Sequence, residues 1–270
     1  MSKEGIGLEM REFNSVSRRR VGIASLVSAL VLLCLVTLVA SKDASATEPT
    51  TSSWYECNQL SKPFKFEDAN CTKEVATGAK WSKSPLEVGK PQALRGTNIG
   101  GEFTMKYTNA GLALEDRCST ASASGTVENQ AGPTAGGQAT IAFSGCTVRK
   151  PEGKGCKFKG GGFTTSALTL VPGNYGGGGK IGFRPTEKFE GRYFIFKYTI
   201  ENCTTAALNG TFAVGGSMAA VPNDSIPGWT FTAASTQLGE GVAYHLEGSI
   251  KTETQETTSG GAWRSLGFTE

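Results

Sequence analysis

The sequence is poor in the side chains that catalytic and metal sites use most often. Among 270 residues there is one histidine, His245, and there is no C-x-x-C pair and no G-x-S-x-G elbow. Tyr244 and Leu246 flank His245 and are predicted to share the buried face of a strand, so the imidazole is predicted to point to solvent. A Ser-His-Asp or Cys-His catalytic site and a Cys/His zinc site are therefore not expected.

Two further kinds of chemistry lack their usual signatures. Four glycines precede Lys180, but a phosphate-binding loop would need glycine at Asn174 and a hydroxyl residue at Ile181. The acidic residues are scattered, and no two stand out as the paired carboxylates of a glycoside hydrolase. We therefore expect a protein that is not an enzyme and that holds no cofactor or metal. A glycan-processing enzyme is the weakest alternative.

Charge of one sign is not in excess either. Residues 1–46 carry six basic and four acidic residues, and the rest of the chain carries 21 basic and 20 acidic residues. This balance gives no reason to propose nucleic acid as a partner. Long helical patterns are also absent beyond residue 46, whereas glycine is abundant, with 36 residues in the whole chain.

The one long apolar run stands near the N-terminus. Residues 21–40 carry no charge and directly follow three arginines at 18–20. As a helix the run would rise about 30 Å, which is one hydrocarbon thickness, and the arginines would keep the N-terminus in the cytoplasm. Residues 1–46 are interpreted either as a signal peptide with an A-x-A cleavage site at 44–46 or as an uncleaved signal anchor. Both interpretations predict that the rest of the chain is exported, with membrane contact only through this segment.

Six cysteines follow the apolar run, namely Cys57, Cys71, Cys118, Cys146, Cys156 and Cys203. An even number of cysteines in an exported chain predicts three disulfide bonds. Cys57 and Cys71 lie in a short segment that cannot bury much apolar surface unaided. We therefore expect these two cysteines to form a disulfide that holds this segment together.

A predicted hairpin indicates partners for the other four cysteines. Two segments with alternating polarity flank the turn-rich stretch 129–137. If they pair across that turn and the ladder continues, Cys118 arrives beside Cys146, within the reach of a disulfide. This geometry favours Cys118–Cys146, which leaves Cys156 for Cys203. The alternative joins Cys146 to Cys156 and leaves the other two to pair.

The exported part is predicted to be all-β. Apolar and polar residues alternate in many short runs, most clearly at 192–200, and clusters of Gly, Pro and Asn separate the runs. This pattern is typical of an antiparallel β-sandwich or a barrel-like domain. The predicted parts are a signal or anchor segment (1–46, with a helix at 21–40), a linker (47–53), a short Cys57/Cys71 module (54–85), a connection (86–100) and a main antiparallel β domain (101–270).

Two groups of side chains are candidates for ligand binding. A basic loop carries five cations that could contact an anionic polymer of the cell wall, and these are Arg149, Lys150, Lys154, Lys157 and Lys159. Three aromatic side chains could stack on sugar rings, and these are Trp54, Tyr55 and Trp81. No catalytic, cofactor-binding or metal-ligating residue is predicted.

Several motifs carry a resemblance to known sequences. They are C-S-T-A-S-A-S-G-T from Cys118, I-A-F-S-G-C up to Cys146, and T-S-A-L-T-L at 165–170. These motifs resemble those of a large group of exported bacterial proteins of unknown function, which are rich in Gly and Thr. The elements W-Y-E-C up to Cys57 and F-E-D-A-N-C up to Cys71 resemble a module that precedes such domains. The resemblance implies a secreted all-β protein and provides no catalytic residues to transfer.

These observations predict a secreted or cell-surface β protein with a structural or adhesive role at the bacterial envelope. The alternative is a protein that binds carbohydrate or an anionic wall polymer. The predicted partners are therefore a cell-wall glycan or an anionic polymer, and the sequence does not indicate an oligomeric state.

Overall fold

The computed structural model describes most of the chain beyond the linker. The described residues are 52–60, 62–109, 112–131, 135–175, 179–223, 225–232, 244–256 and 261–269, and all of them belong to one unit, residues 46–270. The predicted signal or anchor segment lies outside the described residues, as does most of the linker. Within the described ranges, no helix is long and apolar enough to cross a membrane.

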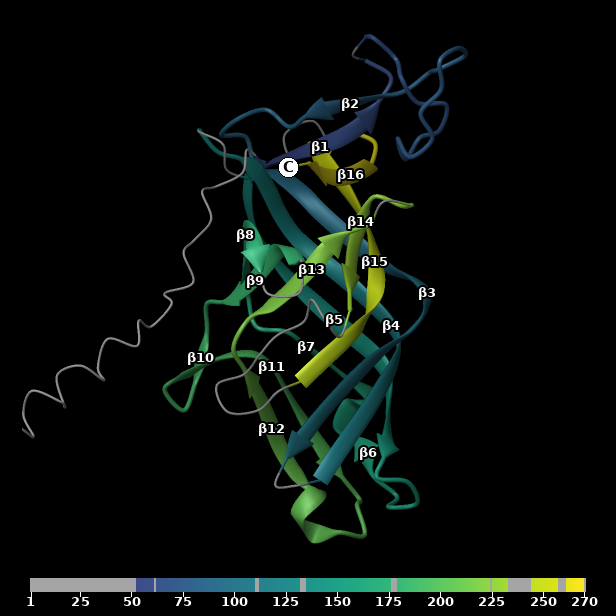
Figure 1. Cartoon of the computed structure of the whole chain (residues 1–270). Coiled ribbons are helices and arrows are strands. Elements are labelled where there is room, and N and C mark those ends of the chain that lie inside the picture. The colour runs from purple at the N-terminus through teal and green to yellow at the C-terminus, as the bar shows by residue number, and fades with distance from the viewer. Residues whose placement is uncertain are drawn as a thin grey trace, which may run out of the picture. The chain divides into compact units, whose positions relative to one another are not determined.

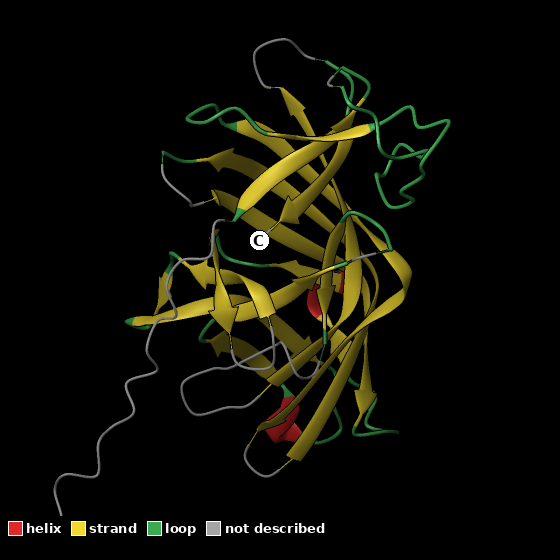
Figure 2. Cartoon of the chain, turned by 45° about the horizontal axis from the view of Figure 1, so that its top comes forward, coloured by secondary structure: helices red, strands yellow, loops and turns green. Residues whose placement is uncertain are grey.

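The described residues form an all-β structure, in which strands predominate and only two short turns are helical (Figures 1 and 2). The strands are β1 (Ser53–Asn58), β2 (Ser82–Pro85), β3 (Gln92–Asn109), β4 (Leu112–Asn129), β5 (Ala135–Lys150), β6 (Lys157–Phe158), β7 (Gly162–Thr164), β8 (Leu168–Tyr175), β9 (Gly179–Pro185), β10 (Lys188–Phe189), β11 (Arg192–Glu201), β12 (Gly210–Gly215), β13 (Met218–Pro222), β14 (Gly228–Phe231), β15 (Tyr244–Glu256) and β16 (Arg264–Thr269). The helical turns are η1 (Lys159–Gly161) and η2 (Ala206–Leu208).

Eight of the strands close into an antiparallel barrel. Their order around the ring is β3, β4, β5, β8, β9, β13, β14 and β15, and β15 pairs with β3 to complete it. Every neighbouring pair is antiparallel. Closure satisfies the backbone groups that an open sheet would expose at its edges. Of the two predicted architectures, the hydrogen-bonded ring decides for the barrel.

Besides β7, which pairs with β5, the remaining strands extend the barrel at two places. β11 pairs with β10, β12 and β6, and β6 also pairs with β5, so this group joins the barrel wall through β5. At the second place β16 pairs with β15, and β1 pairs with β16 and β2. Strands from the two ends of the described chain therefore lie side by side, with Trp54 opposite Phe268.

Aromatic side chains fill the interior of the barrel. The ring centre of Phe103 on β3 lies 5.4 Å from that of Phe143 on β5 and 6.2 Å from that of Phe231 on β14. Phe183 on β9 lies 5.0 Å from Trp229 and 5.4 Å from Phe231. All five side chains are buried, and an eight-stranded barrel has an interior just wide enough for side chains to fill. Burial of these rings is a main source of the barrel's stability.

The barrel begins earlier in the chain than the sequence pattern predicted. β3 starts at Gln92, so most of the predicted connection at 86–100 is barrel strand. The pairing of β3 with β4 shifts register between Thr97 and Phe103, where Gly100 and Gly101 have φ values of 77° and 127°. This bulge interrupts the alternation of polar and apolar residues. The regular pattern therefore becomes recognisable only after Gly101.

The Cys57/Cys71 module has a small buried cluster of its own, formed by Cys57, Phe66 and Cys71 with Trp81 packed against it. Its strand β1 is shared with the rest of the molecule through β16, and only the stretch between β1 and β2 stands apart. Residues 54–85 are therefore joined to the barrel by a strand rather than by a free connection.

The predicted disulfides are confirmed. Cys57 pairs with Cys71, and the Cα atoms are 5.7 Å apart. Cys118 on β4 is directly opposite Cys146 on β5, and the two form a disulfide across the strands. The third disulfide ties Cys156, just before β6, to Cys203, just after β11. The hairpin geometry thus favoured the correct connectivity over the alternative Cys146–Cys156 pair.

Candidate functional site

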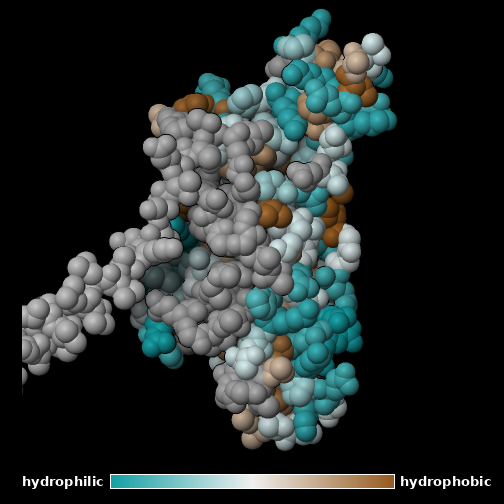
Figure 3. Space-filling view, viewed as in Figure 1, coloured by the Kyte–Doolittle hydropathy of each residue, from teal (hydrophilic) through white to brown (hydrophobic). Residues whose placement is uncertain are grey.

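An open cleft lies between the β10–β11 hairpin and the strands β9 and β12. It has a volume of about 1160 Å³. We call it the basic cleft, after the three cations that line it together with an aromatic ring: Arg184, Lys188, Arg192 and Tyr193. Hydrophilic atoms mark the tip of the hairpin in Figure 3. The site is therefore built from segments that come together only in the fold.

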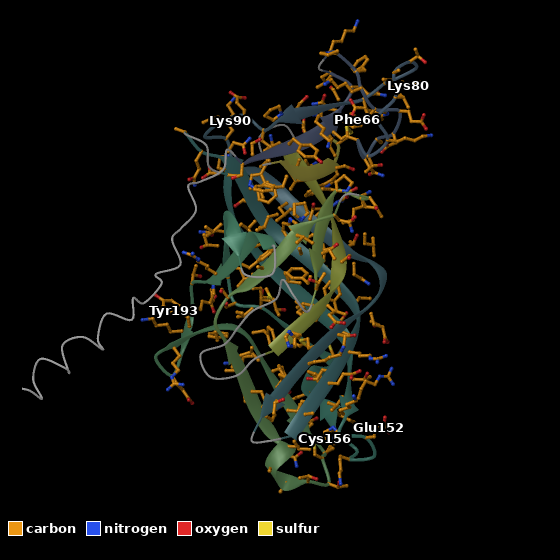
Figure 4. The ribbon with its side chains drawn as sticks, viewed as in Figure 1. Phe66, Lys80, Lys90, Glu152, Cys156 and Tyr193 are labelled. Carbon is orange, nitrogen blue, oxygen red and sulfur yellow. A yellow bond between two sulfur atoms is a disulfide. The ribbon has the colours of Figure 1, made fainter. Side chains whose placement is uncertain are left out.

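The hairpin positions the cationic and aromatic side chains. Lys188 on β10 pairs directly with Tyr193 on β11, and the Lys188 ammonium lies 4.8 Å from the centre of the Tyr193 ring. This cation–π contact helps to hold the ring in place. Tyr193 is 52 % exposed, and Figure 4 shows it on the projecting hairpin. The ring is therefore both partly ordered and accessible.

The turn of this hairpin is strained. Its two central residues, Glu190 and Gly191, have φ values of 51° and 82°. A two-residue turn with positive φ at both positions suits the twist of a hairpin, but a non-glycine residue adopts this conformation at a cost of about 1–3 kcal/mol. Glu190 also lines the basic cleft. Strain of this kind is concentrated at functional sites.

The cations of the basic cleft have no ion-pair partners in the part of the chain that the structure describes. Among the described residues, neither Arg184, Lys188 nor Arg192 forms an ion pair with an acidic side chain. Glu190 is the single acidic residue in the described lining. Converging positive charges create a local potential that attracts anions. The arrangement is therefore suited to hold a ligand with more than one negative charge.

The predicted basic loop is organised differently. An amino group of Arg149 lies 3.8 Å from Glu102, and the Lys150 ammonium lies 3.4 Å from Glu115. The other three cations, Lys154, Lys157 and Lys159, are exposed. Figure 4 labels Glu152 and Cys156 of this loop, far from Tyr193. The five cations therefore do not act as one free surface, because carboxylates face two of them.

The aromatic candidates occupy positions that the sequence analysis did not foresee. Trp54 is 1 % exposed and its indole donates a hydrogen bond of 2.8 Å to the carbonyl of Gly136. Tyr55 is also buried, under the Lys83 ammonium at 4.7 Å from the ring centre. Trp81 is half-buried against the module's disulfide cluster. Trp54 belongs to the core and presents no face to a sugar, which corrects the hypothesis for Trp54. Tyr55 is 8 % exposed and borders a small pocket beside Lys83.

Sequence reasoning missed Tyr193. The alternation in β11 suggested that Phe194, Phe196 and Tyr198 share one buried face. In the structure a bulge lies between Phe194 and Phe196, and Ile195 is buried as well. The alternation itself places Tyr193 on the exposed face, as in the structure, and the bulge alters the burial of Ile195. The available signal was an exposed aromatic residue next to Arg192, just after a Glu-Gly turn.

A second group of polar side chains lies inside the barrel. Asp116 on β4 is fully buried, and its Oδ2 accepts a hydrogen bond of 3.1 Å from the Tyr198 hydroxyl. The Tyr198 hydroxyl also bonds to that of Tyr107. Among the described residues nothing bonds to Oδ1 of Asp116. Burial raises the pKa of Asp116 to about 7, against the opposing effect of the two tyrosine hydroxyls and with a further increase from Glu115.

Asp116 and Tyr198 of this acid cluster are buried, and Tyr107 borders a small surface pocket of about 270 Å³. Burial also raises the pKa of each tyrosine. Near neutral pH the cluster holds or releases one proton. The described residues include no group of three or more His, Cys, Asp or Glu side chains that could hold a metal ion. The basic cleft is therefore the better candidate for ligand binding.

Comparison with known proteins adds no family to this picture. No protein-family model, curated protein or solved structure matches the chain. The resemblance to exported Gly/Thr-rich proteins stays a prediction, and the geometry of the basic cleft carries the functional argument.

Proposed function

We propose that this is an exported, non-enzymatic protein of the bacterial envelope that binds an anionic polymer in the basic cleft. The single observation that carries the proposal is the convergence of Arg184, Lys188 and Arg192 on one cleft without carboxylate partners among the described residues. Arginine side chains bind carboxylates and phosphates through paired hydrogen bonds. A structural or adhesive role follows if the polymer belongs to the cell wall.

The size of the cleft favours an extended ligand. Small-molecule sites typically have volumes of roughly 300–1,000 Å³ and enclose most of the ligand. The basic cleft, at about 1160 Å³, exceeds that range and is open to solvent. A segment of a polymer can enter and leave such a cleft along its length, whereas a small ligand would keep much of its surface in water.

Two further observations support export and binding without catalysis. Three disulfides are typical of proteins in oxidising compartments outside the cytoplasm. The described lining of the cleft has a single carboxylate, Glu190, whereas a glycoside hydrolase needs two at a defined separation. The proposal therefore includes no reaction step, and the N-terminal segment remains a signal peptide or an anchor.

The test removes the same amount of positive charge from two basic regions. Residues 47–270 are produced in oxidised form, and binding to immobilised polygalacturonate and poly(glycerol phosphate) is measured at two salt concentrations. The double variant Arg184→Ser/Arg192→Ser is expected to lose about tenfold or more in affinity, because hydrogen bonds to charged groups are lost. The control Lys154→Ser/Lys157→Ser removes the same charge from the basic loop and is expected to change affinity less than about twofold.

The salt dependence gives a second criterion. Binding of a polyanion by exposed cations weakens as salt rises, because the charges are screened. Binding that does not weaken as salt rises, or that persists in the Arg184→Ser/Arg192→Ser variant, contradicts the proposal. A loss confined to the Lys154→Ser/Lys157→Ser variant would transfer the function to the basic loop.

A further inference from the structure

The basic cleft has a composition that goes beyond a general attraction for anions. Besides its cations it offers the exposed ring of Tyr193 and the hydroxyl groups of Thr211 and Ser217. A polyphosphate chain needs only positive charge, whereas a sugar ring has hydroxyl groups and an apolar face. Aromatic side chains present a flat apolar surface with a polar end, which tolerates partial exposure to water.

Small residues line the cleft on β12, the strand that pairs with β11. Ala213 and Gly215 on β12 line it, as does Gly216 in the turn that follows. Glycine and alanine let a ligand approach the backbone closely. A flat ring can therefore lie close to the backbone of β12, beside the hairpin that carries Tyr193.

The hairpin is held in the conformation that presents these groups. The Lys188 ammonium lies over the Tyr193 ring, and the strained Glu190-Gly191 turn sets the direction of both strands. Pre-ordering reduces the entropy that binding would otherwise cost. Lys188 thus supports the ring on one side and adds a positive charge beside it.

We propose that the basic cleft recognises an acidic sugar within the polymer, with Arg184 and Arg192 contacting its negative group and Tyr193 lying against a face of the sugar ring. This inference rests on the proposed function and names the ligand class of the same site. Thr211 and Ser217 supply hydrogen-bonding groups for the sugar hydroxyls. The ligand is thereby distinguished from polyanions without sugar rings, such as polyphosphate or an acidic peptide.

The test measures three probes of similar length and charge on the intact exported part: polygalacturonate, polyphosphate and poly-L-glutamate. The wild-type protein is expected to bind polygalacturonate more tightly than the other two at the same salt concentration. Tyr193→Leu keeps apolar bulk but removes the aromatic face, and it is expected to weaken polygalacturonate binding about three- to tenfold. Binding of polyphosphate by the same variant is expected to stay within about twofold of wild type.

Two further variants test the roles of the Tyr193 ring and of the negative charge in the cleft. Tyr193→Phe keeps the ring and is expected to retain the preference for polygalacturonate, and its melting temperature shows whether the hairpin is intact. Glu190→Gln removes the one negative charge from the described lining and is expected to raise the affinity for all three polyanions about two- to threefold, since a like charge next to the ligand disfavours binding.

The outcomes separate this inference from the proposed function. Equal binding of the three probes, or equal losses in Tyr193→Leu for all of them, overturns the acidic-sugar inference and leaves anion binding in place. A loss in Tyr193→Phe as large as that in Tyr193→Leu also overturns it, because the ring face is then not what binds. Absence of binding to every probe overturns the proposed function itself.

Discussion

The barrel and the Cys57/Cys71 module are stabilised by different means. In the barrel, side chains from several strands surround one another, and five aromatic rings meet in its interior. Among the described residues of the module, Cys57, Phe66 and Cys71 form the buried cluster, and a disulfide joins two of them. The barrel also has a disulfide, Cys118–Cys146 between β4 and β5, but there it adds to an extensive packed core. A short segment depends more on its covalent link, because it excludes little surface from water.

The largest expected effect comes from the barrel interior. Phe183→Ala removes a ring that contacts both Trp229 and Phe231. The free energy of unfolding is expected to fall by about 3–5 kcal/mol, through lost burial and the cavity left behind. Urea unfolding followed by tryptophan fluorescence measures it. A loss below about 1 kcal/mol would mean that the barrel, like the module, does not depend on its packing.

The two regions also contain acids with opposite responses to pH, and Asp116 in the barrel has the larger expected effect. Its pKa rises from 3.8 to about 7 on folding, chiefly because it is buried. Because the pKa is raised, Asp116 stabilises the folded protein, and this contribution is complete below about pH 4. The contribution is lost as the pH increases to about 7, which lowers the free energy of unfolding by up to about 4 kcal/mol. Unfolding free energies measured between pH 4.5 and 8 test this.

The matched variant for this prediction is Asp116→Asn, which cannot ionise. It is expected to be less stable than wild type at pH 4.5, because one amide group lacks a partner. Its stability relative to wild type is then expected to improve steadily as pH rises towards 8. Parallel curves for the two proteins across this range would show that folding does not raise the pKa of Asp116.

An intermediate effect is expected for the module's disulfide. Cys57→Ala/Cys71→Ala opens a loop with a sequence separation of 14, which costs about 3 kcal/mol in the chain-entropy account. The loss is expected to be local, with faster amide exchange around Phe66 and an unchanged urea transition of the barrel. Simultaneous loss of both regions would show that β1 makes the module and the barrel one cooperative unit.

The regions also differ in how far the sequence predicted them. The β4–β5 hairpin was predictable because its pairing is local, and the register places Cys118 directly opposite Cys146. The burial of Trp54 was not, because it depends on β1 pairing with β16 at the far end of the chain, where Trp54 is opposite Phe268. No local pattern of polarity contains information about such a distant partner.

The same reasoning applies to the candidate site. The sequence drew attention to the basic loop, where five cations are close in sequence. The basic cleft instead collects Arg184, Lys188 and Arg192 with a wall from β12, and only the fold makes them neighbours. Charge density along a chain does not reveal which cations have carboxylate partners. Glu102 and Glu115, which face the basic loop, come from other strands.

The smallest expected effect concerns Asp68, the module's counterpart to Asp116. Its carboxylate accepts hydrogen bonds from the backbone N–H groups of Asn70, Thr72 and Lys73. Burial raises its pKa, but these bonds outweigh burial and the net pKa is lowered. Because the pKa is lowered, ionised Asp68 stabilises the folded protein above about pH 4. This stabilisation is lost as the pH falls through the pKa of Asp68 in the folded state. Asp68→Ala is expected to destabilise the loop by about 1 kcal/mol at pH 7.

Thermolysin cleavage within the module at pH 7, and amide exchange there as the pH is lowered, measure this effect. The control is Glu67→Ala, which removes an exposed ion pair with Lys73 and is expected to change stability by less than about 0.5 kcal/mol. If Asp68→Ala behaves like Glu67→Ala, the backbone bonds to Asp68 contribute little. The disulfide and the burial of Phe66 would then account for the order of this segment, in contrast to the extensive packing of the barrel.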